Sequence, residues 1–277
     1  FLSKRARPDI QTAVSFLCTG VQSPDTDDYK KLARIIRYLR RTINITLNLQ
    51  ANNLSIIKWW VDASYATHPD MRSHTGQVMS LGQGAVYASS SKQKLNTNSS
   101  TEAELVGVND AMTQILWTRY FIEAQGYTVS DNILYQDNES SIRLEKNGKA
   151  SSSKRTRHIN IRYFFVTDRI QKQELSVEHC PTESMVADFL TKPLQGVAFR
   201  KFRDQIMGTT DMPDNTNPSL GISKDYRSVL EKIEEGISDN SNSNDKNKEL
   251  HDVHNKNKEH GESDKENRWI RVSKNRE

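Results

Sequence analysis

The stretch Ser55-Ile56-Ile57-Lys58-Trp59-Trp60-Val61-Asp62-Ala63-Ser64 decides the fold, because it is mostly apolar and rich in residues that favour β-strands. A strand turns successive side chains to opposite faces, so at least one of the adjacent residues Trp59 and Trp60 is expected in a core. We interpret this pair as sheet packing rather than as a platform for stacked bases. Asp62 then stands where the strand ends.

Outward from this strand, strand and helix patterns alternate along the chain. Residues 76–81 and 85–90 predict two further strands, separated by a hairpin turn at Gly82-Gln83-Gly84. Residues 101–125 predict a long amphipathic helix that begins with a capping box, Thr101 at the N-cap and Glu104 at N3. The remaining predicted elements are a strand over 132–136, helices over 139–146 and 158–171, a strand over 175–178 and a short helix over 183–191. This order predicts the α/β class, with helices packed on a mixed sheet.

The first fifty residues predict two helices, one entered at Pro8 and one following Asp25-Thr26-Asp27. Helices of this size bury little apolar surface alone, so the segment is expected to dock on something larger or to end a larger domain. In the second helix, an apolar stripe is accompanied by six cations: Lys30, Lys31, Arg34, Arg37, Arg40 and Arg41. The pattern is compatible with a solvated helix face and with contact to phosphates.

Composition bounds the class of protein. The chain has 277 residues, a formal net charge of +4 and two cysteines. No apolar run approaches the roughly 20 residues of a membrane helix, so we expect a soluble protein, and the cysteine content favours a reducing compartment. Residues 221–277 carry 12 basic and 13 acidic side chains, which leaves +5 on residues 1–220. That excess permits a polyanionic partner without establishing one. We predict domains over 1–53 and 54–208, and a mostly disordered charged tail over 209–277.

Four acidic residues stand at positions where they could converge. Asp62 and Asp137 each end a predicted strand, Glu104 lies in the first turn of the long helix, and Asp188 lies on the closing helix. Clustered carboxylates repel one another and require cations, and hard oxygen ligands suit Mg²⁺ or Mn²⁺. The alternatives are that the aspartates are turn formers or caps, that Glu104 only completes the capping box and that Asp188 is a surface charge.

Six motifs in register carry a resemblance to a known family. They are Val61-Asp62-Ala63-Ser64-Tyr65-Ala66, Ser89-Ser90-Ser91-Lys92-Gln93, Ser99-Ser100-Thr101-Glu102-Ala103-Glu104-Leu105, Asp137-Asn138-Glu139-Ser140-Ser141-Ile142, Arg157-His158-Ile159-Asn160-Ile161-Arg162-Tyr163 and Ala187-Asp188-Phe189-Leu190-Thr191-Lys192-Pro193-Leu194. Over roughly residues 55–200, the chain resembles the ribonuclease H domain of Ty1/copia-type retrotransposon Pol polyproteins. Residues 5–10 and 37–42 resemble the segment that joins the reverse transcriptase to that domain.

The resemblance implies an RNase H-like fold and hydrolysis of the RNA strand of RNA–DNA hybrids with two Mg²⁺ ions, for which Mn²⁺ could substitute. It assigns metal binding and catalysis to Asp62, Glu104, Asp137 and Asp188, with Glu102 as the rival of Glu104. It implies an auxiliary role for His179, and it makes the reverse transcriptase portion of the same polyprotein a partner. We expect backbone contacts from Lys92, Lys94, Arg155 and Arg157, no membrane association, and a location in a cytoplasmic retrotransposon particle or the nucleus.

Two other classes of function stay open on the sequence. A degenerate copy of the element could keep the fold as a non-catalytic module that binds nucleic acid. A structural role, in which this segment only supports the polymerase of a longer chain, would need the fold without the carboxylates. Cleavage of a hybrid that depends on a divalent metal separates the enzyme from both alternatives.

Overall fold

The computed structural model describes residues 1–148 and 160–213, which fall within one compact unit. The predicted phosphate contacts Arg155 and Arg157 and most of the predicted tail, from residue 214 on, lie outside the described residues. Among the described helices, none is long and apolar enough to cross a bilayer.

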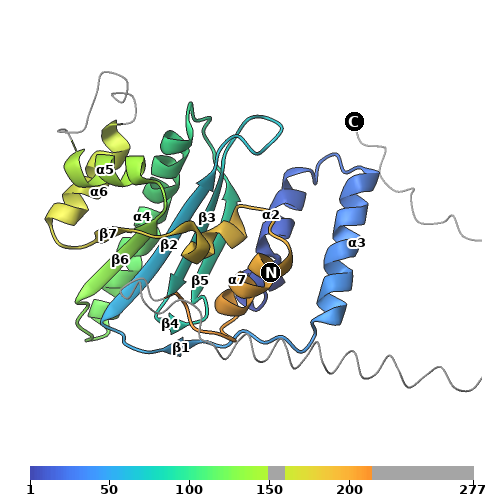
Figure 1. Cartoon of the computed structure of the whole chain (residues 1–277), viewed down its shortest axis with the longest axis horizontal. Coiled ribbons are helices and arrows are strands. Elements are labelled where there is room, and N and C mark those ends of the chain that lie inside the picture. Colours follow the sequence, from blue (N-terminus) through green and yellow to red (C-terminus); the bar gives the residue numbers. More distant parts are fainter. Residues whose placement is uncertain (149–159, 214–277) are drawn as a thin grey trace, which may run out of the picture. The chain divides into compact units, whose positions relative to one another are not determined.

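A five-stranded mixed sheet forms the centre of the unit, in the order β5-β3-β2-β6-β7 (Figure 1). Strand β2, Ile56–Ser64, is central: it pairs antiparallel with β3, His74–Ser80, and parallel with β6, Asp131–Gln136. The edges are β5, Tyr87–Lys92, antiparallel to β3, and β7, Ser176–His179, parallel to β6. The predicted strands are therefore confirmed. The expected turn at Gly82 differs, because β4, Gly82–Gln83, pairs with β1, Gln50–Ala51, in a small second sheet.

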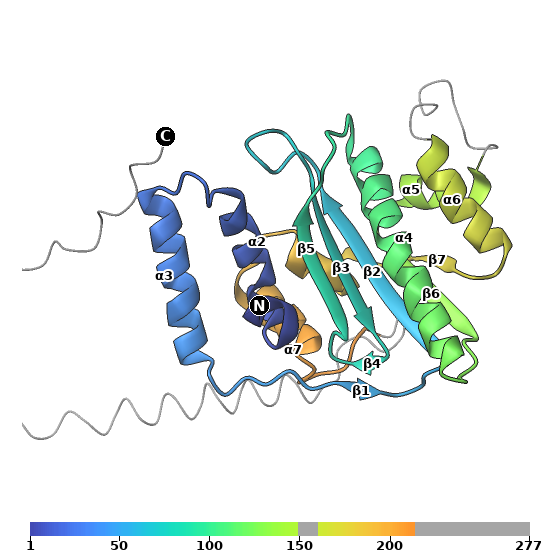
Figure 2. The same ribbon diagram turned by 180° about the vertical axis from the view of Figure 1, so that it is seen from behind.

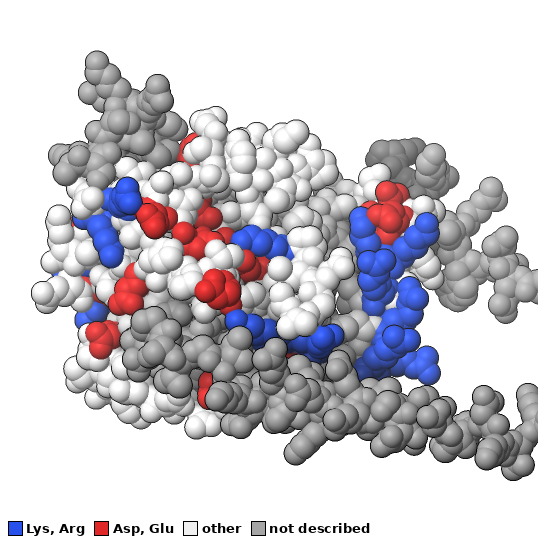
Figure 3. Space-filling model, in the orientation of Figure 1, with Lys and Arg blue, Asp and Glu red and all other residues white. Residues whose placement is uncertain are grey.

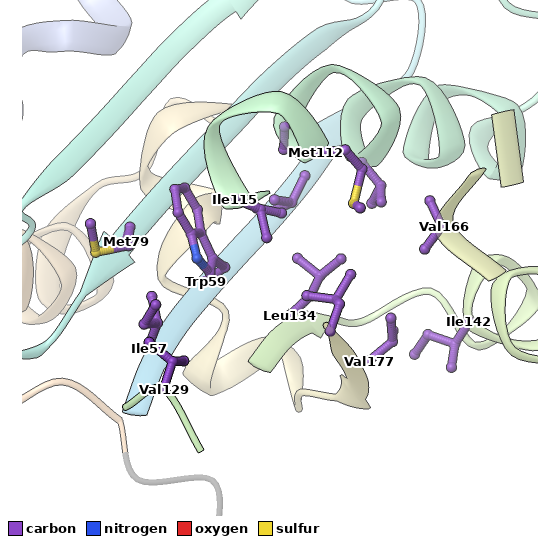
Figure 4. Close-up of a cluster of buried hydrophobic side chains, with 14 of the residues drawn as sticks. Ile57, Trp59, Met79, Met112, Ile115, Val129, Leu134, Ile142, Val166 and Val177 are labelled. Carbon is purple, nitrogen blue, oxygen red and sulfur yellow. The ribbon is translucent and has the colours of Figure 1, made fainter. Parts of the chain in front are cut away.

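The sheet is covered on both faces, so most residues of the central strand are buried. Helix α4, Ser100–Ala124, covers one face, and the 3-10 turn η5, Val186–Leu190, covers the other together with α7, Gly196–Ile206 (Figures 1 and 2). Trp59 packs with the α4 side chains (Figure 4), whereas Trp60 packs with η5 and α7; both are fully buried. Each buried tryptophan removes a large apolar area from water, so the interpretation as sheet packing is confirmed.

Three local predictions differ from the structure. The helix expected over 183–191 is two 3-10 turns, η4, Thr182–Ser184, and η5. Helix α7 was not predicted, although its Phe202 and Ile206 enter the core. The capping box is wrong by two residues, because Ser99 is the N-cap of α4 and its hydroxyl accepts from the Glu102 backbone N–H at 3.2 Å. The helices predicted over 139–146 and 158–171 are present as α5, Glu139–Asn147, and α6, Asn160–Gln171.

The first fifty residues dock on the sheet, as expected for helices that bury little by themselves. They form α1, Leu2–Arg5, η1, Pro8–Ile10, α2, Gln11–Thr19, and α3, Thr26–Arg41. The Gln11 side chain donates to the Ala88 carbonyl at 3.0 Å, and the Phe16 ring stacks on His68 and His74 at centroid distances of 4.7 and 4.6 Å. These contacts join α2 to β5 and to the loop before β3.

A buried ion pair holds α3 to the segment before α2. The Arg7 guanidinium donates twice to the Asp9 carboxylate, at 2.9 and 2.7 Å, and once to the Thr42 carbonyl at 3.0 Å. The Tyr38 hydroxyl donates to Asp9 at 2.7 Å. The two N-terminal stretches that carried the family resemblance are therefore in contact through these side chains.

The Glu145 carboxyl of α5 is fully buried, with one hydrogen bond from the Ser141 hydroxyl at 3.2 Å. Burial raises its pKa from 4.5 to about 8, against the opposing effect of the hydrogen bond from Ser141. The folded protein holds this proton while the unfolded chain releases it, so stability is lost as pH rises between these two pKa values.

We therefore expect Glu145→Gln to gain stability relative to the unaltered protein as pH rises from about 4.5 to about 8. The free energy of unfolding by urea at several pH values measures the difference. Glu139→Gln on the same helix is the control, since its side chain is 66% exposed. A difference for Glu145→Gln that is flat with pH would contradict the prediction.

Candidate metal centre

Three aspartates converge at one end of the sheet. One carboxylate oxygen from each of Asp62, Asp137 and Asp188 lies within 4.8 Å of the others. Asp62 and Asp188 are buried, at 2% and 4% exposure, while Asp137 is half-buried. The protein thus covers the cluster at Asp62 and Asp188, and solvent reaches it at Asp137.

The parallel pairing of β2 and β6 places two of these residues side by side. Trp60 is paired with Tyr135, so Asp62 and Asp137, each two residues further on, leave neighbouring strands at the same edge. Carboxyl ends of parallel strands meet at one edge of a sheet, which is where ligand sites are found in open α/β sheets. Asp188 belongs to η5, which packs on the face of the sheet that carries Trp60.

Glu104 and Glu102 have different surroundings. The Glu102 carboxylate accepts from the Asn98 backbone N–H at 2.8 Å, so it caps the start of α4. Glu104 is 5% exposed, its Oε2 atom is buried without a hydrogen-bond partner, and its carboxyl faces the charges of Asp62 and Asp137. A buried carboxylate oxygen that accepts no hydrogen bond calls for another partner, and a bound cation would supply it.

Burial and mutual repulsion act on the protonation of the cluster. Burial, and then the charges of Asp62 and Asp137, raise the pKa of Glu104 well above its usual range. Burial and the neighbouring Asp62 raise the pKa of Asp188 to about 7, and burial also raises the pKa of Asp62. The charged forms of these groups are costly without a cation, which fits the donor set to a hard divalent metal.

Lys192 and Thr191 complete the site, and the sequence reasoning missed both as site residues. The Lys192 ammonium lies 2.7 Å from Asp188 Oδ1 and 3.8 Å from Asp62 Oδ1, while the Thr191 hydroxyl donates to Asp62 Oδ2. Lys192 stands four residues after Asp188, which is a spacing that could have signalled the ion pair. Its cation offsets part of the negative charge that the aspartates bring together.

The turn that carries Asp188 is held by three side chains that donate to its carbonyls. Thr12 of α2 donates to the Phe189 carbonyl at 2.7 Å, Ser90 of β5 to the Leu190 carbonyl at 2.8 Å and Ser64 of β2 to the Thr191 carbonyl at 3.3 Å. Ser90 is also within 2.8 Å of the His74 ring. Gly76, paired with Asp62, leaves the room that this turn occupies. The position of the Asp188 carboxylate therefore depends on contacts from α2, β2 and β5.

The other predicted contact residues lie at the same end of the sheet. His74 pairs with Ser64 and with Lys92, so Lys92 stands on the edge near Asp62, where its ammonium is 2.7 Å from Asp70. Lys94 is exposed two residues further on. His179 ends β7, is exposed, and pairs with Gln136, the residue before Asp137. No described contact joins His179 to the three aspartates.

Comparison with known proteins gives relatives of one kind. The chain is 34% identical over 209 residues to the retrovirus-related Pol polyprotein from transposon RE1 of Arabidopsis thaliana, with 75% of this chain and 14% of the relative covered. It is 31% identical over 187 residues to the corresponding polyprotein from transposon TNT 1-94 of Nicotiana tabacum, with 67% and 14% covered. No protein-family model matches.

The chain is a homologue of retrotransposon Pol polyproteins. This confirms the predicted Ty1/copia-type resemblance. The Pol homologue spans about one seventh of the length of the curated relatives it matches, 14–15% of each. A solved structure of LC11-RNase H1, isolated from compost, resembles it with a TM-score of 0.37 at 14% identity, covering 53% of this chain and 97% of that one. The predicted mixed five-stranded sheet with flanking helices is confirmed.

Proposed function

We propose that this Pol homologue is a metal-dependent ribonuclease H, which hydrolyses the RNA strand of RNA–DNA hybrids during reverse transcription. The observation that carries the proposal is the convergence of Asp62, Asp137 and Asp188 at one sheet edge, with the buried Glu104 carboxyl near Asp62 and Asp137 and its Oε2 atom without a hydrogen-bond partner. Lys192 offsets only part of the negative charge of the cluster, and buried carboxylates that lack enough cationic partners destabilise a fold.

Asp62, Glu104, Asp137 and Asp188 would hold the cations, Mg²⁺ with Mn²⁺ as a substitute. When bound, two such ions would lower the pKa of a water molecule and stabilise the leaving oxygen of an in-line phosphoryl displacement. The chain itself supplies orientation: Thr191 fixes the Asp62 carboxylate, and the turn held by Thr12, Ser90 and Ser64 fixes Asp188. The half-buried Asp137 marks the side from which a phosphate would approach.

The proposed substrate is supported by the cluster of carboxylates and by the relatives of the chain, which are retrovirus-related Pol polyproteins. In the Pol homologue we propose Lys92, Lys94, Arg155 and Arg157 as contacts to the hybrid backbone, and His179 as an auxiliary group at the exposed end of β7. Selection of hybrid over DNA would rest on 2′-hydroxyl recognition in the minor groove. The reverse transcriptase portion of a longer Pol chain would be the working partner.

The experiment is cleavage of a hybrid labelled on its RNA strand, compared with duplex DNA, duplex RNA and single-stranded RNA of the same sequence. We expect cleavage of the hybrid alone, with Mg²⁺ or Mn²⁺, and its loss when EDTA removes the metal. Binding of hybrid without cleavage under every metal condition would instead support a non-catalytic nucleic-acid-binding module.

Substitution of the two glutamates separates their roles. We expect Glu104→Gln to reduce cleavage by about 100-fold or more, because a ligand that faces the cluster is lost. Glu102→Gln should keep most of the cleavage activity and change stability little, because the glutamine amide oxygen can still accept from the Asn98 N–H and cap α4. Cleavage rates and urea unfolding of both variants check this, and the reverse pattern would give the metal site to Glu102.

A further inference from the structure

Four of the six cations of α3 form a single straight row. Lys30, Arg34, Arg37 and Arg41 are spaced by four, three and four residues, which on a helix places them within about 60° of one another. The other two, Lys31 and Arg40, lie outside this row on either side. Four of the six cations of α3 are thus aligned along one side of the helix, whereas the cations of a merely solvated helix would be spread around it.

The four charged groups of the row are accessible to an anionic ligand. Its four side chains are exposed, and within residues 1–148 and 160–213 none of them makes an ion pair. Lys31, off the row, is the α3 cation that pairs with the acids of the first turn, at 2.7 Å from Asp27 and 3.7 Å from Asp28. From Lys30 to Arg41 the sequence contains no acidic residue. Asp27 in the first turn attracts Lys30 and Arg34 electrostatically, but α3 carries no acidic residue beside Arg37 and Arg41 at its other end.

Basic side chains of α3 are seen on the same face of the described unit as a group of acidic side chains. Figure 3 shows a column of basic side chains along α3, and acidic side chains gathered near the middle of that face beside η5. The position of α3 is tied to the centre by contacts already described: Tyr38 and Arg7 hold Asp9, and Thr12 on the following helix holds the turn of Asp188. A ligand on α3 and one at the centre would be held by a connected scaffold.

The spacing selects the chemistry of the partner. The row extends over about 16 Å of helix, a length over which one strand of a duplex presents about four or five phosphates along its axis. We propose that Lys30, Arg34, Arg37 and Arg41 form a second contact for the RNA–DNA hybrid, binding its backbone at a distance from the cleavage site. This inference rests on the proposed function for its ligand and adds a surface outside the metal centre.

The test is hybrid affinity of the full chain as a function of salt, measured by fluorescence anisotropy in EDTA so that nothing is cleaved. The row variant Arg34→Gln with Arg37→Gln is compared with the off-row variant Lys31→Gln with Arg40→Gln, which removes the same charge from the same helix. Each phosphate contact contributes about 0.9 to the slope of log affinity against log salt. We expect the row variant to lose about 1.8 of slope and roughly tenfold or more in affinity, and the off-row variant to lose much less.

Equal losses in the two variants would overturn the row, since a general charge effect would then suffice. Unchanged affinity in both variants, or no measurable hybrid binding by the unaltered chain, would also overturn it and would favour a protein partner for α3. Thermal unfolding of both variants reports whether the helix remains docked. Cleavage of the same hybrid by the unaltered chain in Mg²⁺ is scored separately, so failure of the nuclease activity is distinguishable from failure of the row.

Discussion

Asp62→Asn is expected to remove hybrid cleavage almost completely, by on the order of 10³-fold, which corresponds to roughly 4 kcal/mol of transition-state stabilisation. Asp62 stands at the centre of the cluster: Thr191 donates to one oxygen, Lys192 approaches the other, and Asp137 and Asp188 lie within 4.8 Å. Asparagine keeps the shape and removes the charge that would hold a cation. The measurement is the initial rate of cleavage of labelled hybrid at saturating Mg²⁺.

The control for Asp62→Asn is Asp131→Asn, an exposed aspartate at the opposite end of β6. It should cleave like the unaltered protein. Burial raises the pKa of Asp62, so its charge is a cost to the fold and Asp62→Asn should unfold at the same temperature or higher. If Asp62→Asn retained cleavage within tenfold of the unaltered protein, the assignment of the metal centre would be wrong.

Gly76→Val is expected to lower the free energy of unfolding by about 3 kcal/mol and to reduce cleavage together with it. A Cβ at Gly76 would lie 2.7 Å from the Ala187 carbonyl oxygen, 2.8 Å from Thr191 Cγ2 and 2.9 Å from Leu190 Cβ. The first of these atoms is backbone, so the η5 turn must leave the sheet. Asp188 moves with that turn, which couples the stability loss to the site.

The matched control is Gly107→Ala on α4, whose new Cβ would lie 3.3 Å or more from the Thr75 side chain. The nearest contact there is with a side-chain methyl group, and it is close. Alanine stabilises a helix relative to glycine by about 1 kcal/mol, which offsets the cost of this close contact. The free energy of unfolding should therefore change little. Urea unfolding and hybrid cleavage of both variants give the comparison. A Gly76→Val variant as stable as the unaltered protein would show that η5 is not packed against β3 at this position.

Prediction from the sequence was successful where a local pattern carried the information. The apolar run of β-favouring residues around Trp59 and Trp60 and the turn residues Gly82-Gln83-Gly84 predicted β2, β3 and β5, and the apolar spacing from Leu105 to Ile122 predicted α4. Prediction failed where packing overrode the local signal. The segment of Asp188 was predicted as a helix, but Thr12, Ser90 and Ser64 hold it as a 3-10 turn. Similarly, α7 is held by burial of Phe202 and Ile206.

The capping error shows why the two glutamates could not be separated by sequence. Ser99 and Thr101 are each followed three residues later by a glutamate, Glu102 and Glu104, so the N-cap could be placed at either of them with a plausible box. Ser99 is the cap in the structure, which makes Glu102 the N3 residue and turns Glu104 toward the aspartates. A shift of two residues on a helix is about 200°, which decides which carboxylate faces the site.

By itself the sequence determined the strands of the main sheet and the long helix α4, the resemblance to Pol polyproteins and the candidate acidic residues with Glu102 as the rival of Glu104, because periodicity and motif order are local properties. Only the tertiary structure decided that Asp62 and Asp137 leave neighbouring parallel strands, that Lys192 and Thr191 join them, and that α2 supports the turn of Asp188. These facts depend on strand order and on contacts between residues more than 100 positions apart, such as Thr12 with Phe189. Such pairs leave no periodic trace in one sequence, since each side chain is locally compatible with many partners.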